Sequence, residues 1–402
     1  MTLALPRRFY SLDALRGLAA LVVVLSHWKH FFSIPGYEPT PFHWGLHPLN
    51  FLLQPLYANG WLAVELFFCL SGFIFFWLYA EKIHRRETSV LEFFIFRFSR
   101  LYPLHLLTLL IVLAGQQFVH RQIGAYFIYP QNDLYHFGLQ LLFMSNWGFD
   151  HGPSFNGPIW SVSVEVFCYA IFFLVCLASW RRWWQLGIII GAGYVMNRYG
   201  HLSIGQGIFS FFIGGITFQI FAWLCQRGFH RKVLPGVVAS TGLLWILIPL
   251  NAHFDGLNRI YSWAWVWPQH LVFLGKDVVA IGLQELSNHA LEIFLFPLTI
   301  LMLALGEVNR GTLGKRIAFL GDISYSSYLW HFPLQLFFAA AVTMGFIPVA
   351  WFSSVWALGV FLLLLLLVSL GSYHFIERPC QSFLRGRLLR RSNSPPYISA
   401  HK

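Results

Sequence analysis

The chain has 402 residues, of which 57% are hydrophobic and 11% charged, and its formal net charge is +11 at pH 7. Soluble domains carry about 25% charged residues, so the composition excludes an ordinary water-soluble protein and indicates an integral membrane protein. The positive net charge is typical of cytoplasmic loops that face anionic lipid. Because the sequence contains no nucleic-acid-binding motif, we expect no nucleic acid partner.

Ten hydrophobic segments follow one another along the chain, each close to the roughly 20 residues that a membrane-spanning helix needs. They lie near residues 12–32, 61–80, 97–118, 158–179, 183–200, 204–225, 235–250, 289–306, 323–345 and 351–372. The sequence therefore predicts an all-α fold, a polytopic bundle of about ten transmembrane helices. Because the chain around these residues is rich in aromatic side chains, it stays undecided whether 269–285 form an additional span.

The distribution of Lys and Arg predicts the topology. With the N-terminus in the cytoplasm, basic residues gather at every cytoplasmic turn, as the positive-inside rule requires, and ten spans place both termini there. We expect one transmembrane domain over 1–380 and a basic, disordered cytoplasmic tail over 381–402. The five cysteines have no metal-ligand spacing, so we expect no metal site.

The first span, LDALRGLAALVVVLSHW at 12–28, carries two ionisable residues, Arg16 and His27. Eleven residues are close to three helical turns, so both side chains share one face, about 16 Å apart along the axis. Ionisable groups inside a span usually mark a pathway or a site. Arg16 beside Asp13 could also be a snorkelling side chain, but the pair on one face favours a polar cavity.

The second span, WLAVELFFCLSGFIFF at 61–76, contains Glu65 and Ser71. Ser71 precedes Gly72, and this dipeptide is more typical of close helix packing than of a nucleophile. Both residues are kept as candidates because a carboxylate and a hydroxyl lie in an otherwise apolar helix.

The third span opens with RFSRLYP at 97–103, in which Arg97 and Arg100 are one turn apart on a helix face. Such a pair can anchor a span at the cytoplasmic surface. It can also clamp phosphate, since guanidinium groups bind phosphate oxygens in a fork. Together with Arg16 the two residues would form a basic mouth on the cytoplasmic side.

The fourth span opens with IWSVSVE at 159–165, which contains Trp160, Ser161 and Glu165. Counted from the ends of their spans, Glu165 and His27 lie at similar depth. A carboxylate that orients an imidazole makes a strong general base, so we expect Glu165 to orient His27. The alternative is a structural Glu165 that is hydrogen-bonded to backbone.

The ninth span opens with ISYSSYLWH at 323–331, which includes Tyr325 and ends on His331. So many hydroxyl groups in a membrane helix indicate either a wet cavity or hydrogen bonds between helices. About eight residues into the span, His331 is expected to face the same interior as His27.

These motifs, together with FFCLSGF at 67–73 and the terminal ERP at 377–379, resemble the acyltransferase-3 family of integral membrane acyltransferases. The matches keep the family's order over residues 9–380. The resemblance implies an O-acetyltransferase type of enzyme in the bacterial cytoplasmic (inner) membrane. It would move an acyl group, commonly acetyl, from cytoplasmic acyl-CoA to a carbohydrate, lipid-linked glycan or other small hydroxyl acceptor.

The resemblance also implies roles for particular residues. Arg16, Arg97 and Arg100 would bind the donor, while His27 and Glu165 would carry the catalysis. Many members have an appended esterase-like domain for polysaccharide acceptors; we expect a type without that domain, which leaves the acceptor class open. Transfer could be direct or could pass through an acyl-enzyme.

Two other function classes fit the composition. A proton-coupled transporter would use the buried Arg, His and Glu as a relay. Many such folds have paired halves and matched broken helices near the midplane, and neither is visible here. A non-enzymatic membrane receptor leaves the placement of Arg16, His27 and Glu165 unexplained.

Overall fold

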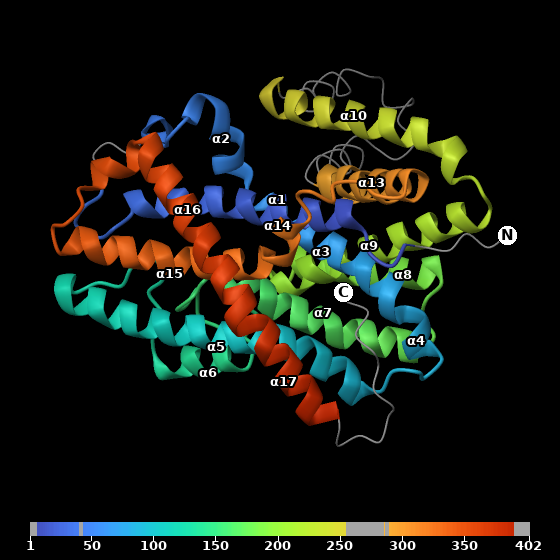
Figure 1. Ribbon diagram of the computed structural model, residues 1–402, viewed down its shortest axis with the longest axis horizontal. Coiled ribbons are helices and arrows are strands. Elements are labelled where there is room, and N and C mark those ends of the chain that lie inside the picture. Colours follow the sequence, from blue (N-terminus) through green and yellow to red (C-terminus); the bar gives the residue numbers. More distant parts are fainter. Residues whose placement is uncertain (1–5, 40–42, 255–284, 286–288, 390–402) are drawn as a thin grey trace, which may run out of the picture.

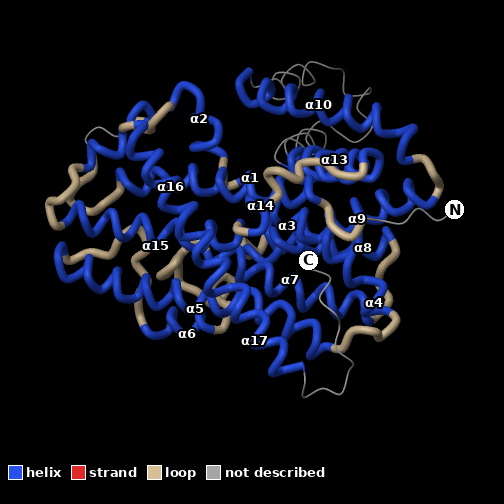
Figure 2. Tube along the Cα trace, viewed as in Figure 1, coloured by secondary structure: helices blue, strands red, loops and turns tan. Residues whose placement is uncertain are grey.

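The computed structural model describes residues 6–39, 43–254, 285 and 289–389, and over these residues the chain is helical without any β-strand (Figures 1 and 2). The predicted all-α fold is confirmed. The helices are α1 (Tyr10–Ser26), α2 (Asn50–Asn59), α3 (Leu62–Phe75), α4 (Glu81–His84), α5 (Val90–Ile123), α6 (Leu134–Leu141), α7 (Ile159–Leu177), α8 (Trp183–Arg198), α9 (Ser203–Gln226), α10 (His230–Phe254), α13 (Phe296–Arg310), α14 (Phe319–Asp322), α15 (Ser324–Thr343), α16 (Val355–Ser372) and α17 (Arg378–Leu389). Short 3-10 turns are η1 (His27–Phe32), η2 (Trp44–Leu46) and η6 (Val349–Ser353).

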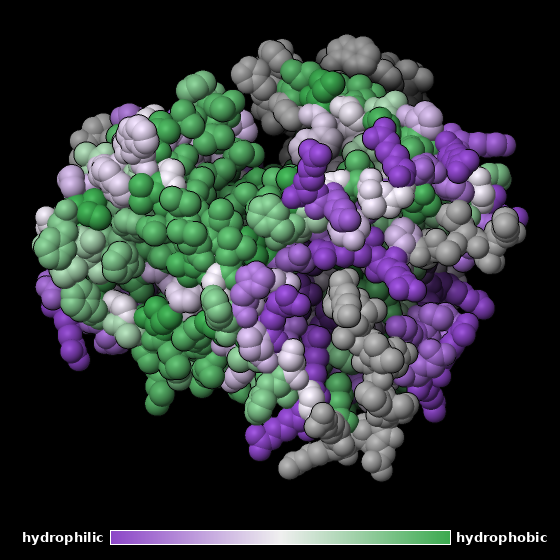
Figure 3. All heavy atoms as spheres, in the orientation of Figure 1, coloured by the Kyte–Doolittle hydropathy of each residue, from purple (hydrophilic) through white to green (hydrophobic). Residues whose placement is uncertain are grey.

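Eight helices of the described chain are long and apolar enough to cross a membrane. They match eight of the predicted segments and span Tyr10–Phe32, Leu62–His84, Val90–Ile123, Ile159–Leu177, Ser203–Gln226, His230–Ile248, Leu291–Arg310 and Val355–Leu389. The two remaining predicted spans correspond to α8, which has 16 residues, and to the hydroxyl-rich α15. The chain is an integral, multi-pass membrane protein, and hydrophobic side chains cover α2, α15 and α16 on the face that Figure 3 shows.

The C-terminal end of the bundle differs from the prediction. Residues 381–389, predicted as part of a disordered tail, belong to α17, which packs against α5 (Figure 1). The predicted domain boundary between 380 and 381 therefore falls inside a helix. The rest of the predicted tail, 390–402, and the predicted extra span at 269–285, apart from Glu285, lie outside the described residues.

Helical π-turns explain why proline does not end the last helix. Three π-turns are described: η3 (Phe76–Ala80), η5 (Leu291–Leu295) and η7 (Tyr373–Glu377). Pro297 and Pro379 each follow such a turn by two residues. Proline has no N–H to donate and its ring crowds the preceding turn, and a wide turn relieves both problems. The helix therefore continues through the ERP motif into α17.

Two glycines bring α3 and α9 into backbone contact. A Cβ atom added to Gly72 would lie 1.8 Å from the Phe211 carbonyl oxygen, and one added to Gly214 would lie 1.8 Å from the Cys69 carbonyl oxygen. Small residues at such crossings let membrane helices approach closely. The predicted packing role of the Ser71–Gly72 pair is therefore visible in the structure, and it fixes the position of Ser71.

We expect Gly72→Ala to destabilise the bundle strongly, because the new methyl group meets backbone that cannot move aside. Overpacking in a core typically costs about 1–3 kcal/mol, and a contact with backbone lies at or beyond the upper end. Thermal unfolding in detergent should show a lower Tm and less monodisperse protein. Gly359→Ala in α16 is the matched control, since a Cβ there meets nothing within 4 Å. An unchanged Tm for Gly72→Ala would contradict the described α3–α9 contact.

Candidate active site

The site begins at the N-terminus of α1, which is held by a buried carboxylate of α13. Glu307 accepts hydrogen bonds from the backbone nitrogens of Tyr10 and Ser11, both at 2.9 Å, and from Ser11 Oγ at 2.6 Å. These bonds satisfy N–H groups that a helix start leaves unpaired, and the negative charge complements the helix dipole. The end of α1 that carries Arg16 is thereby fixed in the bundle.

Arg16 lies where α1 touches α14. A Cβ on Gly321 would lie 2.2 Å from the Asp13 carbonyl oxygen, so only glycine permits this approach. Arg16 Nη2 donates to the Gly321 carbonyl at 2.7 Å and to Asp13 Oδ1 at 3.1 Å. Its Nε is buried without a partner in the described part of the chain. The guanidinium is therefore fixed at one end and keeps an unused donor.

Asp13 is shared between two arginines. Arg8 Nε lies 2.6 Å from Asp13 Oδ2, and Arg8 Nη2 lies 2.7 Å from Asp322 Oδ1. The predicted neighbour of Arg16 is thus part of an ion-pair chain that ties α1 to α14. This chain positions Arg16 but leaves its Nε free for another group.

Arg97 is enclosed by aromatic rings. Its guanidinium carbon lies 4.5 Å from the Phe75 ring centre and 4.7 Å from that of Tyr79, and its Nη2 donates to the Tyr79 hydroxyl. These cation–π contacts hold the side chain in one orientation. As in Arg16, Nε is buried and has no partner within the described residues.

Arg100, one turn along α5, forms no hydrogen bond in the part of the chain that the structure describes. The carboxylates of Glu377 and Glu165 attract it, whereas it repels the Arg16 guanidinium. The charges of Arg16 and Arg100 thus interact, although the two residues come from different helices, α1 and α5. Asp13 and Glu165 attract both guanidinium groups.

Glu165 belongs to this basic cluster. Ser71 Oγ donates to its Oε1 at 2.6 Å, Tyr169 also hydrogen-bonds to it, and it interacts with the charge of Arg16. Within the described residues no hydrogen bond or ion pair joins it to His27. The expected orienting contact between Glu165 and His27 is therefore not found.

His27 is oriented by backbone instead. It is the first residue of η1, directly after α1, and its Nδ1–H donates to the Val23 carbonyl oxygen at 2.9 Å. Since a carbonyl only accepts, Nε2 carries the lone pair. This is the tautomer that a general base needs, and the bond also fixes the plane of the ring.

The depth of α7 explains the missing contact. Its start lies inside the protein: Asn156 is fully buried and donates to the Leu329 carbonyl at 3.2 Å, and Tyr328 donates to the Pro158 carbonyl at 2.9 Å. Residues four apart are about 6 Å apart along a helix, so Glu165 lies one turn further toward the arginines than Ser161. Counting depth from the predicted end of the span assumed that α7 starts at the surface.

Two further histidines surround His27. The ring centres of His30 and His331 lie 4.9 Å and 5.0 Å from that of His27. His331 is fully buried, donates from Nδ1 to the Tyr328 carbonyl at 2.5 Å, and has an unpartnered Nε2. Among the described residues, however, no group of three His, Cys, Asp or Glu side chains is arranged to hold a metal ion.

Gln335 joins two of these histidines. His30 Nδ1 donates to Gln335 Oε1 at 3.0 Å, and Gln335 Nε2 donates to the His27 carbonyl oxygen at 2.8 Å. His30 is thus fixed in the same tautomer as His27, with its lone pair on Nε2. Gln335 holds η1 against α15.

The remaining predicted site residues do not all lie in one place. Ser161 Oγ is 2.7 Å from the Tyr328 hydroxyl, next to the histidines. Trp160 packs in the core, and Tyr325 donates to the Leu101 carbonyl at 2.6 Å, which joins α15 to α5. Glu65 accepts hydrogen bonds from Gln206 and Ser210 in a separate polar cluster between α3 and α9.

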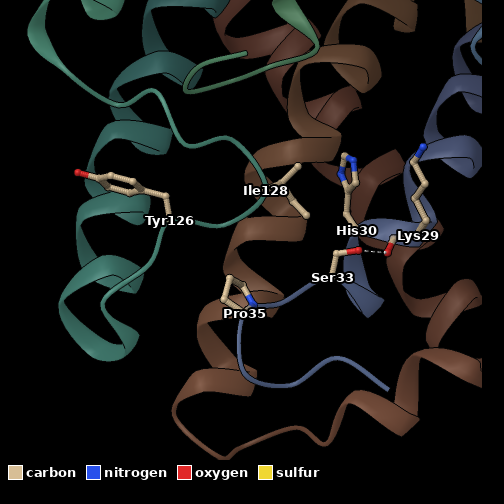
Figure 4. Close-up of a pocket in the computed structure, with 6 residues that line it drawn as sticks. All are labelled: Lys29, His30, Ser33, Pro35, Tyr126 and Ile128. Atoms are coloured by element: carbon tan, nitrogen blue, oxygen red, sulfur yellow. Dashed lines mark hydrogen bonds between the residues drawn. The ribbon is translucent and has the colours of Figure 1, made fainter. Parts of the chain in front are cut away.

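A surface pocket of about 470 Å³ lies beside His30 (Figure 4). It is formed by η1 with the chain that follows it and by the loop after α5, and its lining residues are Lys29, His30, Ser33, Pro35, Tyr126 and Ile128. His30 thus lines the pocket, and its ring lies 4.9 Å from that of His27.

The loop after α5 is held rigidly at this pocket. Gln116 bonds both the N–H and the carbonyl of Phe127, each at 2.9 Å, and Ile128 has a φ of 61°. A β-branched residue in the left-handed region is strained and persists only where surrounding contacts impose it. At the end of the loop, hydrogen bonds from the backbone N–H and the imidazole of His136 hold the pKa of Asp133 below its usual range.

Polar side chains therefore connect the two ends of the bundle. From the arginine end they run through Glu165 to Tyr328, whose ring interacts electrostatically with Glu165 and lies 5.7 Å from that of His331. His331 then leads to His27, His30 and the pocket.

A family model for an acyltransferase domain matches residues 9–374. The chain belongs to the acyltransferase-3 family. Among the curated relatives, Protein 2 in picA locus of Rhizobium radiobacter is 37% identical over 109 residues, covering 27% of this chain and 46% of the relative. O-acetyltransferase OatA of Staphylococcus aureus is 22% identical over 404 residues, covering 93% of this chain and 57% of the relative. The chain thus spans about half the length of these relatives, and no solved structure matches it.

In this acyltransferase-3 chain, sequence reasoning found His27 and His331 but missed His30 and Gln335. Their spacing from the predicted histidines could have revealed both residues. His27 and His30 are three residues apart, one turn of a 3-10 helix, and His331 and Gln335 are four apart on α15. Arg385 of α17 was missed because residues beyond 380 were assigned to a tail.

Proposed function

We propose that this protein is a membrane O-acyltransferase that moves an acyl group, best acetyl, from acyl-CoA to a hydroxyl acceptor. The acceptor is a carbohydrate, a lipid-linked glycan or another small hydroxyl compound. The protein is located in the bacterial cytoplasmic membrane. The observation that carries the proposal is the polar path between the Arg16–Arg100 cluster and His27. Family membership and the similarity to an O-acetyltransferase support the reaction type.

The arginine cluster fits a polyphosphate donor. Arg16 and Arg97 each keep a buried Nε without a partner, and Arg100 forms no hydrogen bond within the described residues. Phosphate oxygens would satisfy these donors and relieve the repulsion between Arg16 and Arg100. The positive-inside rule assigns this end to the cytoplasm, where acyl-CoA is made.

The spacing along α1 suits a long, thin donor. Arg16 and His27 are separated by eleven residues, about 16 Å along a helix, and an extended pantetheine arm has a comparable length. With the phosphates at the arginines, the thioester would reach the histidine cluster. The acceptor would enter from the opposite end, through the pocket beside His30.

The chemistry needs one proton to move. His27 Nε2 takes the proton of the acceptor hydroxyl as its oxygen attacks the thioester carbon. The new C–O bond forms, the C–S bond breaks, and the departing CoA thiolate takes the proton back from the imidazolium. His331, whose ring lies 5.0 Å from that of His27 and is held by the Tyr328 carbonyl, is a positioning residue. The oxyanion donor is not assigned.

The direct experiment uses purified protein in nanodiscs. We expect CoA release from acetyl-CoA to require pooled cell-envelope glycans, and labelled acetyl to appear on them. Acetyl-CoA alone should leave the protein mass unchanged, since transfer is direct. A stable mass increase of one acetyl group would instead establish an acyl-enzyme. Solute flux in proteoliposomes without any CoA release would contradict the proposal and favour a transporter.

A further inference from the structure

The helix α17 takes the place of the first part of the predicted tail. α17 lies beside the N-terminal part of α5, the part that carries Arg97 and Arg100 (Figure 1). A third arginine is thereby added to that pair from a segment nearly 300 residues away. Arg385 Nε donates to Ser99 Oγ at 3.1 Å, and its Nη2 donates to the Phe96 carbonyl at 3.4 Å.

The position of Arg385 is defined on two sides. Its guanidinium carbon also lies 5.1 Å from the centre of the Phe96 ring, so Phe96 and Ser99 together hold the group against α5. Its Nη1 has no hydrogen bond in the described part of the chain. The anchored edge thus leaves the opposite edge available to a ligand.

Arg385 lies among like charges. It is half-buried, Arg97 and Arg100 both repel it, and within the described residues no carboxylate forms an ion pair with it. Bringing like charges together in a partly buried place is unfavourable. An anionic ligand bound between the arginines would remove that cost.

Depth along α5 separates Arg385 from Arg100. Phe96 and Ser99, which hold Arg385, flank Arg97 and precede Arg100. Arg385 therefore lies level with Arg97 and nearer than Arg100 to the N-terminal end of α5, the end assigned to the cytoplasm. In CoA the pantetheine arm comes first, the diphosphate next, and the ribose 3′-phosphate outermost. With the arm directed toward His27, the diphosphate would lie at Arg16 and Arg100, and the 3′-phosphate further out, beside Arg97 and Arg385.

We propose that Arg385 of α17 binds the 3′-phosphate of the acyl-CoA donor and so makes the enzyme select CoA over its 3′-dephospho form. This inference rests on the proposed function, since it names a contact within the same donor site. It gives α17 a role as the outer wall of that site. No bond is made or broken at Arg385, which acts only as a binding and specificity residue.

The test measures the binding of CoA and 3′-dephospho-CoA to the full-length protein in nanodiscs by calorimetry. We expect the wild type to bind CoA about 10- to 100-fold more tightly, because a hydrogen bond between charged groups is lost with the 3′-phosphate. Arg385→Ala should weaken CoA binding by a similar factor and leave 3′-dephospho-CoA binding unchanged. Arg387→Ala, an exposed arginine of the same helix, is the matched control and should keep the wild-type preference.

The outcomes separate the two proposals. Equal affinity of the wild type for the two compounds would overturn the Arg385 assignment even if Arg385→Ala does not fold. An equal loss for both compounds in Arg385→Ala would assign Arg385 to the packing of α17 instead. If the wild type binds neither compound, the proposed function itself fails, and the inference fails with it.

Discussion

Replacing His27 with alanine is expected to lower acyl-CoA turnover by about 10²- to 10⁴-fold, the usual loss when a general base is removed. Its Nδ1 is fixed by the Val23 carbonyl, so Nε2 is the only ring nitrogen available to take a proton. The arginine cluster lies at the other end of the path, and the KM for acyl-CoA should therefore stay close to that of the wild type.

The kinetics of acceptor-dependent CoA release measure this effect. His374→Ala is the matched control, since His374 is exposed and should leave kcat unchanged. His331→Gln should have an intermediate effect, because His331 acts through His27. Turnover of His27→Ala within a few-fold of the wild type would mean that His27 is structural.

The second large effect is expected for the donor. Arg100→Ala should raise the KM for acyl-CoA by about 10- to 100-fold, the equivalent of one lost charge-assisted hydrogen bond, with a smaller change in kcat. Arg100 is the cleanest of the three arginines to test, because it has no hydrogen bond in the described chain whose loss would disturb the fold. Arg97, by contrast, packs within aromatic rings.

The matched control for Arg100 is another basic residue on the side of the membrane that is predicted to be cytoplasmic. Arg316 is exposed and precedes α14, and Arg316→Ala should leave the KM unchanged. Arg100→Lys should recover only part of the affinity, since an ammonium cannot form the two-pronged contact of a guanidinium. A KM for Arg100→Ala equal to that of the wild type would contradict the phosphate assignment.

Much of the fold could be read from the sequence because membrane helices satisfy their own backbone, so each span is recorded locally as a run of apolar residues. The Arg16–His27 pair was also accessible, since helical spacing fixes which residues share a face. Arg16, Arg97 and Arg100 were expected to gather at one end, and the charges of Arg16 and Arg100 do interact in the structure.

The contact between Glu165 and His27 could not be predicted reliably, because it depends on how deep α7 starts. That depth is set by long-range contacts, the bonds of Asn156 and Pro158 to α15, which leave no local pattern. α17 was missed for a related reason. A proline after Glu377 reads as a helix end, whereas the π-turn at Tyr373–Glu377 lets the helix continue.

The central claim is that donor and acceptor approach from opposite ends of one polar path. The most direct test uses proteoliposomes with pooled cell-envelope glycans trapped inside, with the protein's orientation determined by protease access to α17. Labelled acetyl-CoA is added outside. We predict labelled glycans inside those vesicles whose α17 end faces outward, and none when that end faces the lumen. Labelling that requires acetyl-CoA and glycan on the same side would contradict the account.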